Sequence, residues 1–208
     1  MISNELIHSL AASLKPVKVL RYSWKEYSVA LLAGLFSVLA GIALSGVRPD
    51  IQNVVLSASF ITQSIALLVL AILSTVSALQ MSIPSLEKPV SQKIAVVTLF
   101  FWTVTIVYLL LNSNSPFAGW GFACAREIAL SSITPTAILF ILTRTSVILD
   151  RLSSGWLILT AGAAYGAIAT QFSCSMSDPL HLLIWHALPV FLIGLIGMAV
   201  GILIIKKL

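Results

Sequence analysis

The sequence contains few charged residues: only 9% of its 208 residues are Asp, Glu, Lys or Arg, whereas 59% are hydrophobic. Soluble globular proteins carry about 25% charged residues, so this composition excludes a soluble domain. Several apolar runs approach or exceed the roughly 20 residues that a helix needs to cross a bilayer. We therefore expect an integral membrane protein.

A clustered basic surface is also missing, although the formal net charge is +5. The Lys and Arg residues are spread over the ends of the apolar segments, an arrangement that membrane topology explains better than a nucleic-acid-binding surface does. We therefore expect no direct contact with nucleic acid. The first two dozen residues are polar or amphipathic, so we expect the first apolar run to stay as an uncleaved anchor.

Cysteine is scarce, with only Cys124 and Cys174 in the whole chain. Two cysteines are too few for a disulfide framework, and their spacing differs from that of known zinc motifs. The chain has no Cys-x-x-Cys motif, which argues against a membrane thiol oxidoreductase. We therefore expect neither an enzyme nor a cofactor.

Ionisable residues are rare inside the apolar segments, where Gln63 and the helix-bending Pro135 are the main polar or irregular positions. Transport pathways usually need ionisable groups or broken helices near the membrane midplane. This scarcity argues against a small transporter or channel, which we keep as the alternative function.

The apolar runs predict an all-α fold, a polytopic bundle of six transmembrane helices separated by polar, Pro- and Gly-containing loops. Pairs of glycines four residues apart, Gly162 with Gly166 and Gly197 with Gly201, are typical of close helix packing. These glycine pairs could pack within one chain or between two chains. The expected spans are residues 28–45, 54–79, 93–111, 128–142, 155–172 and 182–205.

Lys and Arg residues predict the orientation of the helices, because cytoplasmic loops carry an excess of positive charge. If the N-terminus lies inside, only Arg48 and Arg126 of the 12 basic residues lie on the outer side. We therefore expect both termini in the cytoplasm.

The predicted orientation brings the two cysteines to the outer face, since Cys124 precedes the fourth span and Cys174 follows the fifth. A disulfide needs Cα atoms about 4.4–6.8 Å apart, and loops that flank neighbouring helices can meet this requirement. We favour a functional pairing of the two thiols. The alternative is that each cysteine is a small apolar residue that simply packs.

Two histidines, His181 and His186, follow Cys174 closely and suggest a metal site that would include both cysteines. However, a spacing of five residues does not place two side chains on one face of an α-helix. Cys124, Cys174, His181 and His186 are therefore only weak candidates for metal ligands. We expect His186 and Trp185 to anchor the helix at the membrane interface or to form hydrogen bonds between helices.

Residues 1–26 form a separate N-terminal segment, followed by the transmembrane domain, residues 27–208. Leu6, Ile7, Leu10 and Leu14 recur at helical spacing until Pro16, after which a basic connector follows. Two interpretations of this helix stay open. It can lie on the anionic inner leaflet, or it can dock a soluble protein partner.

Four short motifs stand out in combination. They are Leu6-Ile7-x-x-Leu10-Ala11, Pro16-Val17-x-x-Leu20, Gly46-Val47-Arg48-Pro49-Asp50 and Cys174-x-x-x-Asp178-Pro179-x-His181-x-x-x-Trp185-His186. With the number and lengths of the spans, they resemble the NrsF-type anti-sigma factors. These proteins are six-span inner-membrane negative regulators of sigma F, an extracytoplasmic-function (ECF) sigma factor. The resemblance covers essentially the whole chain.

The resemblance implies a location in the bacterial inner membrane and a cytoplasmic sigma factor as the protein partner. Carried over to this sequence, Cys124 and Cys174 would be a periplasmic pair that senses redox or metal stress. A change at this pair would shift the packing of the spans, with the glycine faces as candidate sliding surfaces, and release the sigma factor. The sigma-contacting residues would be Leu6, Ile7, Leu10, Ala11, Pro16 and Val17.

Overall fold

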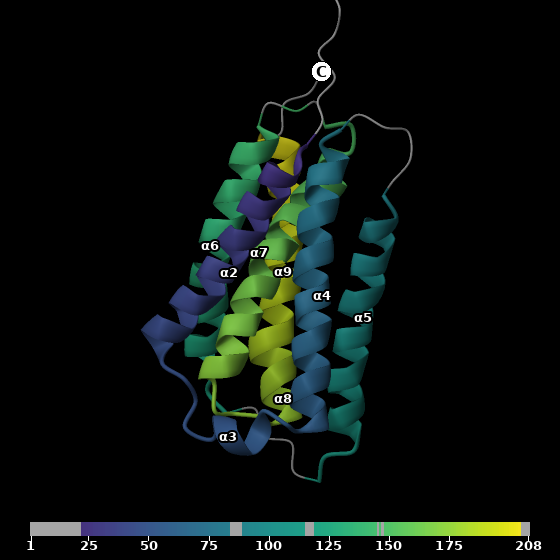
Figure 1. Cartoon of the computed structure of the whole chain (residues 1–208). Coiled ribbons are helices and arrows are strands. Elements are labelled where there is room, and N and C mark those ends of the chain that lie inside the picture. The colour runs from purple at the N-terminus through teal and green to yellow at the C-terminus, as the bar shows by residue number, and fades with distance from the viewer. Residues whose placement is uncertain (1–21, 84–88, 115–118, 145, 147, 205–208) are drawn as a thin grey trace, which may run out of the picture.

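The protein is a bundle of long antiparallel helices (Figure 1). The computed structural model describes residues 22–83, 89–114, 119–144, 146 and 148–204, and within them every regular element is a helix. A short helix, α3 (Ile51–Val54), precedes the second long one. The long helices are α2 (Trp24–Ser45), α4 (Ala58–Met81), α5 (Val90–Leu111), α6 (Phe122–Thr143), α7 (Arg151–Ser173) and a last one made of α8 (Pro179–Leu182), η1 (Leu183–Ala187) and α9 (Leu188–Ile204).

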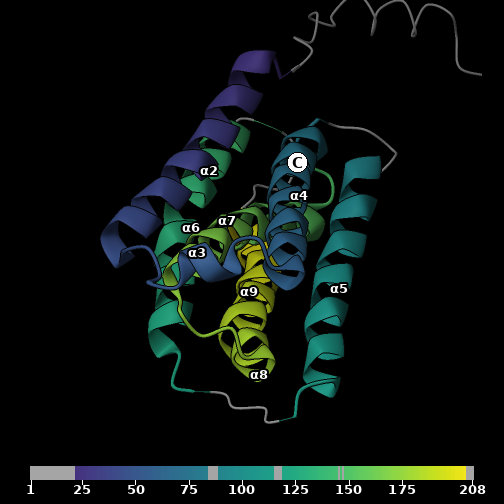
Figure 2. The same cartoon turned by 60° about the horizontal axis from the view of Figure 1, so that its bottom comes forward.

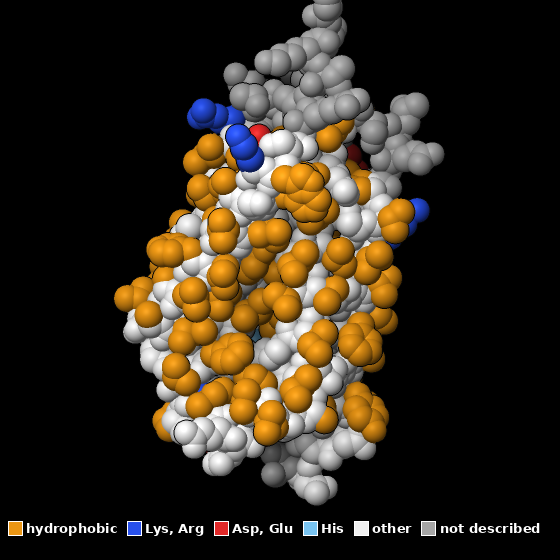
Figure 3. All heavy atoms as spheres, viewed as in Figure 1, with side chains coloured by type: hydrophobic (Ala, Val, Ile, Leu, Met, Phe, Trp, Pro, Cys, Tyr) orange, Lys and Arg blue, Asp and Glu red, His pale blue; other side chains and the backbone are white. Residues whose placement is uncertain are grey.

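The outside of the bundle is apolar along most of its length. Phe100 is 70% exposed and Leu32 is 62% exposed, and Figure 3 shows many such hydrophobic side chains on one face. Six helices are long and apolar enough to cross a membrane, with lengths of 22 to 25 residues. At about 1.5 Å per residue this length matches a hydrocarbon core of about 30 Å. The prediction of a six-span helical membrane protein is confirmed.

Helix α7 lies at the centre of the bundle, and α9 packs against it. Helices α2 and α6 lie on one side of this pair, and α4 and α5 lie on the other (Figures 1 and 2). Small residues permit the close contacts of α7: a Cβ atom on Gly155 would lie 2.1 Å from the Gly197 carbonyl oxygen, and one on Gly166 would lie 2.4 Å from that of Ile128. The glycine faces therefore pack within the chain.

The two ends of the bundle differ in what they carry. We call the end with Cys124 and Cys174 the cysteine end, and the end where α2 begins the Tyr22 end. Figure 2 brings the cysteine end forward and shows α3 lying across it. Tyr22 packs at the opposite end, where its hydroxyl donates to the Leu142 carbonyl oxygen at 3.2 Å and lies 2.8 Å from Ser146 Oγ.

The fourth span begins earlier than hydropathy predicted, at Phe122 rather than near residue 128. Cys124 therefore lies in the first turn of α6 and not before the helix. The backbone N–H groups of Cys124 and Ala125 both donate to the Gly121 carbonyl oxygen, which starts the helix. Polar residues extend a helix past its apolar part because backbone hydrogen bonds, not hydropathy, define where it begins.

Candidate functional site

Four side chains with sulfur or imidazole donors meet at the cysteine end. Cys124 comes from the first turn of α6, and Cys174 is the residue that ends α7. His181 comes from α8 and His186 from η1. One donor atom from each residue can be chosen so that all four lie within 4.8 Å of one another.

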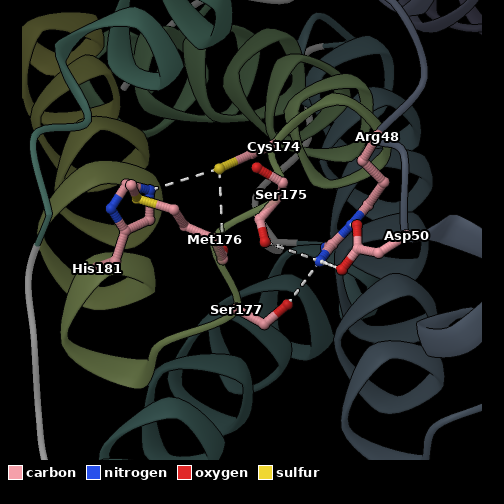
Figure 4. Close-up of polar contacts among 7 residues, drawn as sticks. All are labelled: Arg48, Asp50, Cys174, Ser175, Met176, Ser177 and His181. Carbon is pink, nitrogen blue, oxygen red and sulfur yellow. Dashed lines mark hydrogen bonds and ion pairs between the residues drawn. The ribbon is translucent and has the colours of Figure 1, made fainter.

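The thiols are close enough to react with each other or to share a ligand. The Cys124 thiol lies 3.3 Å from Cys174 Sγ, and both cysteines are free. His181 Nε2 lies 3.7 Å from Cys124 Sγ and 3.5 Å from Cys174 Sγ (Figure 4 shows the second contact). The expectation that the hairpin would bring the two cysteines together at one end of the bundle agrees with this geometry.

The expectation that His181 and His186 would not lie on one face of the helix was wrong, because it assumed α-helical periodicity. Residues Leu183–Ala187 form a π-helical turn, in which the Leu188 N–H donates to the Leu183 carbonyl oxygen five residues earlier. A turn closed over five residues brings positions five apart onto the same face. The rings of His181 and His186 accordingly lie 5.6 Å apart, centroid to centroid.

Pro189 supplies the sequence signal for this turn. A proline inside a helix cannot donate a hydrogen bond, and its ring clashes with the carbonyl group four residues before it. That carbonyl belongs to Trp185, which lies inside the π-turn. Widening the turn relieves the clash, and π-bulges are frequent at functional sites.

The start of α8 is fixed by an aspartate. Asp178 caps the helix, and its Oδ1 accepts hydrogen bonds from the backbone N–H groups of Leu180, at 2.9 Å, and His181, at 3.4 Å. Pro179 occupies the first helical position, where a missing N–H costs nothing. Together these two residues set the position from which the His181 side chain reaches the thiols.

A buried arginine holds the loop after Cys174. Arg48, only 4% exposed, donates to both carboxylate oxygens of Asp50, at 2.7 and 2.8 Å. The same guanidinium donates to the Ser175 carbonyl oxygen at 3.1 Å and to Ser177 Oγ at 2.9 Å (Figure 4). We call Arg48, Asp50, Ser175 and Ser177 the arginine latch. In the sequence Arg48 stands out only as an outer charge and a motif residue, and these contacts were not predicted.

The electrostatics of the site favour a thiolate at Cys174. The hydrogen bond from the Cys124 thiol lowers the pKa of Cys174 below its usual value, and the neighbouring His186 lowers it further, whereas burial opposes both effects. At the other side of the loop, the Arg48 guanidinium lowers the pKa of Asp50 and keeps its carboxylate charged. A thiolate is the form that attacks oxidants and binds metal ions.

A cleft of about 550 Å³ opens beside the thiols, between α2, α6 and α7. Cys124, Cys174 and the carboxyl group of Glu127 are among its lining residues. Small reagents can therefore reach the thiols through this cleft.

On another side, Gly121 lets the chain pass close to the histidines, since a Cβ atom there would lie 2.5 Å from His181 Cε1 and 2.4 Å from Trp185 Cγ. The exposed Trp120 packs beside Trp185 with the two rings tilted by 58° and their centroids 5.6 Å apart.

The arrangement suits two kinds of chemistry. Two thiols in contact can be oxidised to a disulfide, and the same thiols can capture a thiophilic cation. The residues expected to contact a sigma factor cannot be placed beside this site, because Leu6, Ile7, Leu10, Ala11, Pro16 and Val17 lie outside the described part of the chain.

Comparison with models of protein families identifies a family for this chain. A family model described as NrsF, negative regulator of sigma F, matches residues 10–206. No curated protein and no solved structure matches the chain. The matched region includes all six long helices and both cysteines, almost the whole of the 208 residues. The chain therefore belongs to the NrsF family, the negative regulators of sigma F.

Proposed function

We propose that this protein is an anti-sigma factor of the bacterial inner membrane that sequesters an ECF sigma factor in the cytoplasm and releases it when the periplasmic pair Cys124 and Cys174 reacts. Family membership supports a sigma factor as the partner. The observation that carries the sensing part is the contact of the two thiols, 3.3 Å apart, at one end of a bundle that spans the membrane.

The proposed orientation rests on charge. Among the described basic residues, Lys25, Lys93, Arg144 and Arg151 lie at or near the Tyr22 end, whereas Arg48 and Arg126 lie at the cysteine end. An excess of positive charge marks the cytoplasmic side. The cysteine end then faces the periplasm, where thiols meet oxidants and metal ions first.

The sigma factor would be held by the N-terminal segment, which continues directly into α2. Its apolar residues Leu6, Ile7 and Leu10, with Ala11, Pro16 and Val17, would form the contact surface, as an amphipathic helix does in a partner's groove. Release requires that the two states of the thiol pair differ in affinity for sigma, typically by about 5- to 150-fold.

Co-purification with the sigma factor tests the binding part of the proposal. Membranes solubilised in a mild detergent should yield the sigma factor together with the wild-type chain. Leu6→Asp with Leu10→Asp should abolish co-purification, because a charge on the apolar face prevents docking. His8→Asp is the control, since it places a negative charge on the opposite side of the predicted helix. Equal capture by both variants would contradict the docking surface.

A transcriptional reporter tests the sensing part. Cys124→Ser with Cys174→Ser should keep the sigma-dependent promoter repressed and remove its response to thiol oxidants and soft metal ions. Full induction in the double variant would contradict the proposed sensing role of the two cysteines but not the proposed binding of the sigma factor.

A further inference from the structure

We propose that Cys124, Cys174, His181 and His186 form a four-ligand, tetrahedral binding site for a divalent thiophilic cation such as Zn²⁺ or Cd²⁺. The inference rests on the proposed function in one respect, since the bound cation would be the signal that releases the sigma factor. It goes further by naming the ligand class and by giving both histidines a direct role.

The distances among Cys124, Cys174 and His181 are close to those around a coordinated ion. With metal–sulfur bonds of about 2.3 Å and metal–nitrogen bonds of about 2.0–2.1 Å, tetrahedral geometry places two sulfurs about 3.8 Å apart and a sulfur and a nitrogen about 3.5 Å apart. The observed separations are 3.3 Å between the thiols and 3.5 and 3.7 Å from them to His181 Nε2. These three donors could therefore hold an ion after small shifts, and the full set of four, whose donor atoms lie within 4.8 Å of one another, would contract around it.

The histidines distinguish this site from a simple thiol pair. His181 is 1% exposed and His186 is 3% exposed, and neither is needed to form a disulfide. Within the described residues, His186 Nε2 makes no hydrogen bond although it is buried. A buried nitrogen without a partner is costly, and a ring held beside two thiols can use its nitrogens for a metal ion or for the hydrogen bond that orients a ligand.

The backbone around the ligands is built to hold them. The π-turn puts the two imidazoles on one face, Asp178 fixes the start of the helix that carries His181, and the arginine latch holds the loop between Cys174 and His181. Such outer contacts orient metal ligands in known sites. The cleft beside the thiols, with the Glu127 carboxyl group in its wall, gives a cation a way in.

Charge balance selects a divalent ion. Binding forms two metal–sulfur bonds and two metal–nitrogen bonds in place of bonds from the ion to water, and any proton that a thiol still holds, above all that of Cys124, leaves to the solvent through the cleft. Two thiolates and two neutral imidazoles around a divalent cation make a neutral complex, which is the form that tolerates the low dielectric at the edge of a membrane. Mixed sulfur and nitrogen donors in tetrahedral geometry suit Zn²⁺ and related ions.

Titration of the reduced, metal-free full-length chain in detergent with Cd²⁺ or Zn²⁺ tests the site. We expect one ion per chain by elemental analysis, and a Cd²⁺–thiolate charge-transfer band in the ultraviolet. In known sites, removing a residue that only orients a metal ligand lowers metal affinity 10- to 100-fold. Removing a ligand itself should cost at least as much, so His181→Ala and His186→Ala should each lower the affinity by about 100-fold or more. His8→Ala is the matched control. It removes the third histidine of the chain, which is not one of the four donors, so it should bind the ion as the wild type does.

A donor exchange guards against variants that fail to fold. His186→Cys keeps a ligand at the position, so it should restore binding and strengthen the charge-transfer band through a third thiolate. Wild-type affinity in both His→Ala variants would overturn the four-ligand site and leave a two-thiol site. A His186→Cys variant whose charge-transfer band keeps the intensity expected of two thiolates would also overturn the four-ligand site.

The reconstituted complex with the sigma factor separates this inference from the proposed function. Cation binding without release of sigma supports the site and contradicts the proposed trigger. Release by an oxidant, with no binding of Cd²⁺ or Zn²⁺ to the reduced chain, overturns the metal site and leaves the proposed anti-sigma function standing.

Discussion

Helices α7 and α2 both run between the two ends of the bundle, yet they are packed very differently. In their most apolar stretches 72% of the residues of α7 are buried, against 22% for α2. Helix α7 contacts helices on all sides, whereas α2 is held along one stripe, with Ala30, Gly34, Ser37 and Gly41 as its buried residues. A helix that packs on all sides holds its neighbours in place, whereas a helix that packs on one side can shift at a lower cost in free energy.

The contacts at the ends of α2 give this contrast a functional meaning. At the cysteine end, α2 leads into the arginine latch, which grips the loop of Cys174. At the Tyr22 end, the residues just before α2 are bonded to the end of α6. We therefore expect α7 to stay in place and α2 to act as the link that transmits a change at the thiols to the N-terminal segment.

The largest effect is expected from filling the contact between α7 and α9. In Gly155→Leu the new side chain would meet the backbone of Gly197 and Gly201, which cannot move aside. Overpacking of this kind typically costs about 1–3 kcal/mol and sometimes more. Thermal denaturation in detergent should show a clearly lowered midpoint. Ala129→Leu, on an exposed position of α6, is the control and should melt as the wild type does.

An intermediate effect is expected from opening the arginine latch. Arg48→Ala removes the hydrogen bonds to Asp50, Ser175 and Ser177, which lie in loops outside the long helices, so we expect a loss of about 1.5–3 kcal/mol in the local stability of the Cys174 loop. The bundle should stay folded, while amide hydrogen exchange at residues 175–177 accelerates and the promoter response to thiol reagents weakens.

Arg126→Ala is the matched control for the latch, because it removes an exposed positive charge at the same end. If exchange at residues 175–177 were equally slow in Arg48→Ala and in the wild type, the latch would not hold the Cys174 loop and the link through α2 would lose its support.

The smallest effect is expected at the other end of the link. Tyr22→Phe removes one hydroxyl and with it the contacts to the Leu142 carbonyl oxygen and Ser146, a loss of about 0.5–1.5 kcal/mol. Repression should become slightly leaky while the melting midpoint hardly moves. Tyr108→Phe, at an exposed position of α5, should leave the reporter unchanged. A stronger effect from Tyr108→Phe would argue against a specific role for Tyr22.

Hydropathy and loop composition were sufficient to predict the six helices and the end of the bundle at which both cysteines lie. They could not predict where α6 begins, because residues 122–127 are too polar to be counted in a span yet continue its backbone hydrogen bonds. The glycine spacing indicated close packing, but which helix each glycine faces depends on tertiary structure alone.

The site was predictable only in part. The two cysteines could be paired from topology, whereas the histidines were set aside on α-helical periodicity, which Pro189 and the π-turn invalidate. The role of Arg48 was hidden because its partners Ser175 and Ser177 lie more than 120 residues away in the sequence. No local pattern encodes such a contact.

The position of Trp185 has an optical consequence. Trp185 belongs to the π-turn, and its indole lies against Gly121 and beside the exposed Trp120. Indole emission responds to nearby thiolates, heavy ions and stacked rings, so a change at the four donor residues should alter the fluorescence of this tryptophan pair. Intrinsic tryptophan fluorescence would therefore report the proposed reaction or ion binding without an added label.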